Sequence, residues 1–405
     1  MKDKITIIIN AKIYTINEEN DVKKFIDDND GIKVVYGKGW SLSIFEGEEV
    51  GKGPKKEHLD EVSRDIPIVL SISGFKWCMD PEIYKELIDD DRLKIRVSAG
   101  FSISPDISPI HQIDIIRGIR ERIDSNYFKT TTIKFLADGV IEGTTASLIE
   151  PYEIEAGKGE NYYGDFLWDK DEFSKAIEYA NKNGFSIHVH SIGDNATKLI
   201  LDAIEKDDLD DQTDYRNSIT YIQLVRKEDI KRFKKLNIIA SVQPYWHLKG
   251  PNWWDVVDYK LVGERAKHEY PLNSFVEAGV RIASSSDHSA TPVPNPFFAI
   301  QAGVTRNLYN ASYFCVKTIC NIDEEKWLLN QEERVSVEEM VRSFTINGAY
   351  LIFRDDEIGS IEVGKYADFI VLDRDIFEIE PLDIEKTQVL MTFFDGEVVY
   401  QRDNL

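Results

Sequence analysis

Residues 185–204 read FSIHVHSIGDNATKLILDAI and contain a strand that leads directly into a helix. The first six residues are typical of a short buried strand, with His190 at its end. Asp194 stands where a helix N-cap is expected, and apolar residues then recur at the i, i+3, i+4 spacing of a helix with one apolar face. A neutral imidazole at the end of a buried strand is a good metal ligand. This junction therefore indicates a βα unit and a candidate metal site.

The same alternation of β-rich and helical segments continues along most of the chain. The β-rich runs fall at residues 33–36, 66–72, 93–99, 131–136, 185–190, 218–222, 238–242 and 280–284. Helical spacing separates several of them, as in residues 173–180, where Gly184 follows as a helix stop. Eight strands in such alternation predict an α/β protein with a (β/α)8 TIM-like barrel, complete or incomplete, whose active site lies at the carboxyl ends of the strands.

The pattern changes after about residue 355, where turn-rich sequence precedes two short β-rich runs. Residues 369–372 and 392–400 predict antiparallel strands, with a turn at Asp395 and Gly396. Two further short strands are predicted within residues 5–16. The simplest architecture is a small β-sandwich-like domain, formed by residues 1–17 and 355–405, beside a barrel formed by residues 18–354.

Composition excludes several classes of partner. The 405-residue chain has 72 acidic and 49 basic side chains, a formal charge of -23, and no basic run that could follow a phosphate backbone, so we expect no nucleic acid. No apolar stretch approaches the roughly 20 residues that cross a bilayer, so we expect no membrane. Three cysteines without a CxxC pair favour a reducing cytoplasm over a disulfide framework.

Four side chains stand at predicted strand ends, where barrel chemistry is expected. Lys134 lies within a strand too apolar for an unpaired ammonium, His190 and Tyr221 end two later strands, and Asp287 follows the last. Imidazole and carboxylate both suit zinc and similar ions. Lys134, His190 and Asp287 therefore form a candidate metal site, and Tyr221 is a candidate substrate contact beside it.

Each of these residues also has a purely structural interpretation. His190 could be a hydrogen-bonded structural histidine, Lys134 could pair with Asp138 or Glu142, and Asp287 could be a helix N-cap. His188, two residues before His190, lies on the same side of a regular strand but about 6.6 Å deeper, which favours a role in the core.

Two other positions are candidates for substrate binding. His288 follows Asp287 at the expected rim of the barrel, where it would contact substrate or solvent. Trp246 lies in the aromatic-rich loop at residues 244–259, which either lines a substrate pocket or packs on its own aromatic side chains.

A set of motifs gives the chain a family resemblance over nearly its whole length. The motifs are GKGW at 37–40, IKFLADG at 133–139, VHSIGD at 189–194, QLVRKEDIKRF at 223–233, ASVQP at 240–244, SSD at 285–287, TINGAY at 345–350 and EIGSIEVGKYADFIVLD at 357–373. Together they resemble the amidohydrolase superfamily, and specifically its YtcJ-like group, amidohydrolase family 3. The resemblance implies a metal-dependent hydrolase that cleaves C–N bonds in amides and related groups.

The resemblance also implies roles for individual residues. Lys134 matches a carboxylated lysine that bridges metal ions, His190 matches the ligand at the end of strand five, and Asp287 matches the aspartate after strand eight. Asp287 would also transfer the proton between the attacking hydroxide and the leaving amine. A divalent ion lowers the pKa of bound water and polarises the carbonyl, which permits attack near neutral pH.

The chain departs from the family pattern in three places. The first-strand HxH metal pair has no counterpart, Tyr221 stands where strand six carries a histidine ligand, and Phe75 stands where a histidine contacts substrate. Three of six expected ligand positions therefore match, which favours one divalent ion, zinc, over a binuclear centre. A barrel without its first strand either closes with one of the early runs, stays open, or is covered by a partner subunit such as a second copy.

We therefore expect a metal-dependent hydrolase that acts on a non-peptide C–N bond of a small organic molecule. The alternative is a catalytically degenerate protein that keeps the fold for ligand binding or as a remnant. A third hypothesis is a site rebuilt for a different reaction, such as metal-free acid–base chemistry by His190 with Asp287.

Overall fold

The computed structural model describes residues 35–40, 68–72, 81–90, 92–93, 95–206, 213–251, 253–288, 290–291, 293–317 and 319–403. The residues divide into two units, Met1–Trp77 with Asp287–Pro294 and Cys78–Ser286 with Asn295–Leu405. The strands described in the first unit are β1 (Val35–Trp40) and β2 (Ile68–Ile72), which pair in parallel. Phe75 and residues 1–17, to which the sequence assigned a substrate contact and part of a β domain, lie outside the described residues.

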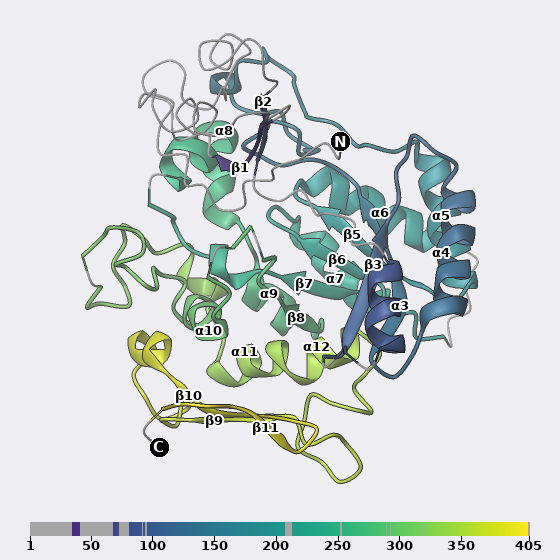
Figure 1. Ribbon diagram of the computed structural model, residues 1–405. Helices are drawn as coiled ribbons and strands as arrows, with labels where there is room; N and C mark the ends of the chain where they lie inside the picture. Colours follow the sequence, from purple (N-terminus) through teal and green to yellow (C-terminus); the bar gives the residue numbers. More distant parts are fainter. Residues whose placement is uncertain are drawn as a thin grey trace. The chain divides into compact units, whose positions relative to one another are not determined.

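The second unit contains a parallel sheet of six strands in sequence order, which confirms the predicted α/β class (Figure 1). Its strands are β3 (Val97–Ser102), β4 (Phe128–Leu136), β5 (Ser186–Ser191), β6 (Ser218–Tyr221), β7 (Ile239–Val242) and β8 (Ile282–Ser284). Each of the eight predicted barrel strands overlaps a strand of the structure. The third begins four residues later than predicted, because Leu93 packs in a small cluster with Ile123 and Phe128 before the chain pairs with β4 at Val97.

Helices connect successive strands and pack along the sheet (Figure 1). They are α3 (Pro81–Asp89), α4 (Pro109–Ile123), α5 (Lys170–Lys182), α6 (Asp194–Lys206), α7 (Lys227–Lys235), α8 (Tyr259–Val262), α9 (Leu272–Glu277), α10 (Pro296–Thr305), α11 (Val337–Phe344) and α12 (Ile346–Leu351). Helix α5 ends before Gly184, whose φ of 72° confirms the predicted helix stop. Within the described ranges, no helix combines the length and the apolar character needed to cross a bilayer.

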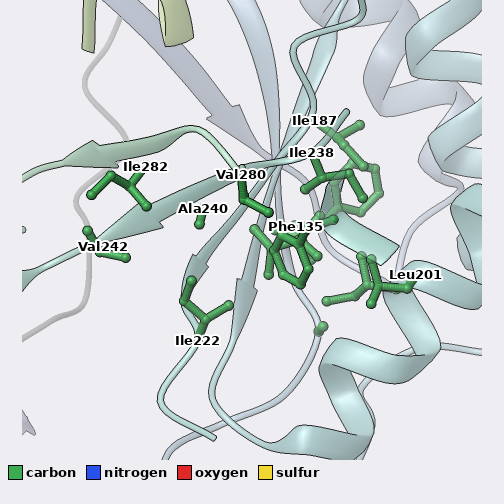
Figure 2. Packing of buried hydrophobic residues seen from close by; sticks show 14 of the residues in the cluster. Phe135, Ile187, Leu201, Ile222, Ile238, Ala240, Val242, Val280 and Ile282 are labelled. Carbon is green, nitrogen blue, oxygen red and sulfur yellow. The ribbon is translucent and has the colours of Figure 1, made fainter. Parts of the chain in front are cut away.

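The two faces of the six-stranded sheet differ in chemistry. Phe135 of β4 pairs in register with Val189 of β5, and both side chains are fully buried in the main hydrophobic core, part of which Figure 2 shows. Burial of each such side chain contributes roughly 1.5–3 kcal/mol. The alternate residues form the second face, where Lys134 pairs in register with His188 and the hydroxyls of Thr132 and Ser186 lie 2.9 Å apart. The helices therefore cover an apolar face, and polar side chains occupy the opposite one.

A three-stranded antiparallel sheet follows near the end of the chain (Figure 1). It contains β9 (Phe369–Leu372), β10 (Val389–Phe394) and β11 (Glu397–Gln401). The turn between β10 and β11 consists of Asp395 and Gly396, with φ values of 52° and 81°, as the right-handed twist of a two-residue hairpin requires. The predicted hairpin is thus confirmed, while its membership of a separate domain with residues 1–17 stays a prediction.

Gly193 provides a test of the tight junction between β5 and α6. A Cβ at this position would lie 1.9 Å from the Ser147 carbonyl oxygen, whereas one at Gly118 in α4 would meet nothing within 4 Å. We expect Gly193→Ala to lower the free energy of unfolding by about 1–3 kcal/mol through overpacking. Gly118→Ala should raise it by about 0.5–1 kcal/mol, because alanine favours the helix. Urea unfolding of both variants measures the difference, and equal effects would contradict the packing at Gly193.

Candidate active site

The carboxylate of Asp138 connects the loops that follow β4 and β5. Its side chain is 1% exposed, and it accepts backbone N–H groups from Ser147 at 2.9 Å, Ile192 at 3.0 Å and Gly193 at 2.8 Å. These three donors are hydrogen-bond partners of the two carboxylate oxygens, and the suggested pairing of Lys134 with Asp138 or Glu142 stays a prediction. Burial raises the pKa of Asp138 to about 7, although the three N–H groups act to lower it.

His190 at the end of β5 is oriented by the same loop. Its Nε2 lies 2.8 Å from the Gly139 carbonyl oxygen and 3.7 Å from Oδ1 of Asp138. A carbonyl oxygen only accepts hydrogen bonds, so Nε2 carries the proton and the neutral ring has its lone pair at Nδ1. Metal-binding histidines characteristically donate their second ring N–H to a carbonyl or carboxylate in this way.

Near the carboxyl ends of β4, β5 and β6, Lys134, His190 and Tyr221 come together, and Trp246 joins them from the turn Pro244–Trp246 after β7. The centre of the Tyr221 ring lies 5.3 Å from Nζ of Lys134 and 4.7 Å from the centre of the His190 ring. Trp246 stacks on Tyr221, with the two ring centres 5.8 Å apart and an interplanar angle of 5°. Tyr221 has a left-handed φ of 73°, which turns the chain at the end of β6. Two predicted metal ligands, Lys134 and His190, and two predicted substrate contacts, Tyr221 and Trp246, are therefore neighbours.

Three further candidates, His188, Asp287 and His288, make different contacts. His188 Nδ1 lies 2.7 Å from Oγ of Ser218 on the neighbouring strand, in agreement with the predicted core role. Asp287 and His288 belong to the first unit. There the Asp287 carbonyl accepts N–H groups from Ala290 and Thr291, and His288 Nδ1 lies 3.2 Å from the Thr291 carbonyl oxygen. The convergence of Asp287 with Lys134 and His190 stays a prediction.

Most of the chain matches a known protein family. Residues 78–400 match the model of the amidohydrolase family. The chain belongs to the amidohydrolase family. It is 27% identical to the putative amidohydrolase YtcJ of Bacillus subtilis over 282 residues, which cover 70% of this chain and 49% of YtcJ. It is also 28% identical to the N-substituted formamide deformylase of Arthrobacter pascens over 243 residues, which cover 60% of this chain and 41% of that enzyme. The chain thus spans about half the length of such relatives, or less.

Solved structures show the same amidohydrolase fold. An uncharacterized metal-dependent hydrolase from Pyrococcus horikoshii superposes with a TM-score of 0.63 at 20% identity, over 91% of this chain and 82% of that one. The corresponding protein from Pyrococcus furiosus gives a TM-score of 0.61 at 22% identity, over 90% and 82% of the two chains. The predicted TIM-like barrel fold is therefore confirmed.

Potential metal ligands are sparse among the described residues of this amidohydrolase-family chain. Across the described ranges, no group of three or more His, Cys, Asp or Glu side chains is arranged to hold a metal. His190 has the tautomer of a ligand, but Tyr221 provides only a phenol where a second imidazole would add a stronger donor. Lys134 has no lone pair as an ammonium and requires carboxylation to become a ligand.

A buried carboxylate pair, Asp258 and Glu269, lies in the segment between β7 and β8, and sequence reasoning missed it. Gln223 Nε2 donates to Oε1 of Glu269 at 2.8 Å and to Oδ1 of Asp258 at 3.4 Å. Asp258 ends the π-helical turn Trp254–Asp258, a rare conformation that is frequent at functional sites. Burial raises the pKa of Glu269 well above its usual range, and the charge of Asp258 raises it further. No periodic pattern marks these residues, because tertiary contacts bring them together.

Asp138 provides a test of how the two loops are held together. In Asp138→Asn, the amide NH2 would face N–H donors that the carboxylate now accepts, so we expect a loss of about 1–3 kcal/mol in the free energy of unfolding. Asp169→Asn is the matched control, because one oxygen of Asp169 accepts both N–H groups at the start of α5 and asparagine keeps that oxygen. Denaturant unfolding measures both, and a stable Asp138→Asn protein would contradict this role.

Glu269 provides a test of pH dependence. The unfolded carboxyl ionises above about pH 4, whereas the folded one keeps its proton to higher pH, so the folded state binds more protons and stability falls as pH rises. Glu269→Gln removes this pH-dependent loss of stability. The variant should therefore have a higher free energy of unfolding than the native protein at pH 8, and the difference should shrink toward pH 4. Glu264→Gln, at a carboxylate whose pKa Lys267 lowers, should not flatten the profile. Unfolding free energies across this range are the measurement, and parallel profiles would rule out a raised pKa at Glu269.

Proposed function

We propose that this protein is a metal-dependent hydrolase that cleaves a C–N bond of a small organic molecule other than a peptide. The observation that carries the proposal is the orientation of His190, whose Nε2–H is donated to the Gly139 carbonyl so that the lone pair lies at Nδ1. Membership of the amidohydrolase family supports the reaction class. The relative named N-substituted formamide deformylase supports substrates of the amide type.

In this proposal His190, carboxylated Lys134 and Asp287 hold one divalent ion, with zinc as the expected metal. A bound zinc ion would lower the pKa of a water molecule and polarise the substrate carbonyl. Asp287 accepts the proton of the nucleophile and returns it to the leaving nitrogen. Tyr221 and Trp246 form an aromatic wall against the substrate, and His288 and Phe75 complete the contacts.

A second candidate is a non-catalytic member of the family that binds a ligand. Tyr221 favours it, because a phenol packed against Trp246 and His190 fills the position of a ligand histidine. The two candidates differ in metal dependence. Stoichiometric zinc with hydrolysis of simple formamides or acylamides supports the enzyme, and a protein that never retains metal supports the binding protein.

Metal content is the direct test. We expect purified protein loaded with zinc to retain about one ion per chain. His190→Asn should lose the ion, because only two of the three proposed ligands, Lys134 and Asp287, remain. Tyr221→His should tighten zinc binding by adding an imidazole. Elemental analysis and competition with a chelating dye measure both effects.

His188→Asn is the control for the metal experiment, since His188 lies on the same strand and bonds to Ser218. It should keep its zinc. Failure of the native protein to take up zinc, or equal zinc content in His190→Asn, would reject the metal site. Circular dichroism of each variant separates loss of the ligand from loss of the fold.

A further inference from the structure

A polar cavity of about 320 Å³ lies at the amino ends of strands β7 and β8. Its polar lining comes from five separate elements: Lys234 of α7, Asn237 before β7, Arg281 before β8, Glu339 and Arg342 of α11, and Asn347 of α12. His190 and Tyr221 lie at the carboxyl ends of their strands, so this cavity is at the opposite end of the sheet. Active sites of this fold occupy the carboxyl ends.

The charge of the cavity is opposite to that of the chain. Lys234, Arg281 and Arg342 contribute three cations, and Glu339 contributes one carboxylate, whereas the whole chain has a formal charge of -23. Among the described residues, none of these three cations forms an ion pair within 4.0 Å. By contrast, nearby Arg232 pairs with three carboxylates. In a chain with excess acid, cations that pair with no carboxylate are available to an external anion.

Arg281 is held in place before any ligand arrives. Its guanidinium carbon lies 3.7 Å from the centre of the Tyr350 ring, and its Nη1 donates to Oδ1 of Asn347 at 3.3 Å. Asn347 is fixed in turn by donating Nδ2 to the Ile282 carbonyl at 2.9 Å. A guanidinium held in this way presents its remaining N–H groups in a fixed fork, which matches the oxygens of a phosphate or carboxylate.

One further carboxylate lies at the edge of the cavity. Asp214 accepts Nδ2 of Asn237 at 3.0 Å and the hydroxyl of Tyr350, and it lies 3.5 Å from Nε of Arg216. Arg216 lies outside the cavity lining and is shared between Asp214 and Asp355. The net charge of the lining stays positive.

Helix ends provide a competing explanation for two of the cations. Lys234 and Arg342 fall in the last turns of α7 and α11, where a positive charge interacts favourably with the carbonyl end of a helix. Arg281 lies outside any helix, just before β8, and this explanation does not apply to it. Three cations from separate elements around one cavity favour a ligand.

We propose that this cavity binds a small organic anion that carries phosphate or carboxylate groups. Its volume is at the lower end of the range for small-molecule sites, which fits a compact metabolite of two or three charges. The site is independent of the proposed hydrolase reaction, because it shares no residue with it.

Calorimetric titration of the full chain with inorganic phosphate, pyrophosphate and citrate tests the proposal at low ionic strength. We expect saturable binding of at least one probe, with Lys234→Gln and Arg342→Gln each raising its Kd by about tenfold through the loss of one charge-assisted hydrogen bond. Pyrophosphate stronger than citrate would assign a phosphorylated ligand, and the reverse would assign a polycarboxylate.

Two variants provide matched controls. Glu339→Gln removes the single lining carboxylate and should lower the Kd, while glutamine preserves the capping position three residues after Ser336. Lys231→Gln, also in α7 but outside the cavity lining, should leave the Kd unchanged. Binding of no probe would overturn the proposal. The helix-end explanation predicts a different result. Under it, Lys234→Gln and Arg342→Gln would lower the thermal midpoint of the free protein but bind the anion as tightly as the native chain. That result would also overturn the proposal.

Discussion

The buried carboxylate of Asp138 is the constraint on which the candidate site depends. Its two oxygens accept three backbone N–H groups from the segments that follow β4 and β5. Without the carboxylate, these three buried donors would lose the partners that the structure gives them. The same connection positions the Gly139 carbonyl, which in turn fixes the His190 ring. The orientation of the His190 ring therefore depends on a residue that is not one of the proposed metal ligands.

Burial of this acid has an electrostatic cost that the three N–H groups offset only in part. Removal from water raises the pKa of Asp138 to about 7, although hydrogen bonds to the charged form oppose the shift. Glu269 and Asp258 are also buried carboxyl groups with few hydrogen-bond donors, since the two share the side-chain amide of Gln223. Acidic groups thus support the loops at the carboxyl ends of the strands as well as giving the surface its negative charge.

The two faces of the sheet explain how one scaffold carries a rigid core and a polar site. On β4, Phe135 is next to Lys134, and on β5, Val189 is next to His190. Each strand therefore contributes side chains to the core and to the polar site. The apolar partners are fully buried under the helices, which limits movement of the strands and hence of the polar side chains between them. Tyr221 departs from this regular alternation through its left-handed backbone, and its ring packs between His190 and Trp246. An aromatic ring thereby occupies the carboxyl end of β6.

The sequence by itself determined the strands, the helices between them and the hairpin at Asp395 and Gly396, because periodicity and turn chemistry are local properties. It also placed Lys134, His190 and Tyr221 together, since parallel strands in chain order bring their carboxyl ends to one edge. Only the tertiary structure decided that Asp138 bonds to three backbone N–H groups, and that Glu269 and Asp258 share Gln223. The basic cavity around Arg281 also belongs to this second class. These contacts join residues distant in sequence through the packing of loops and helix ends, for which no spacing rule exists.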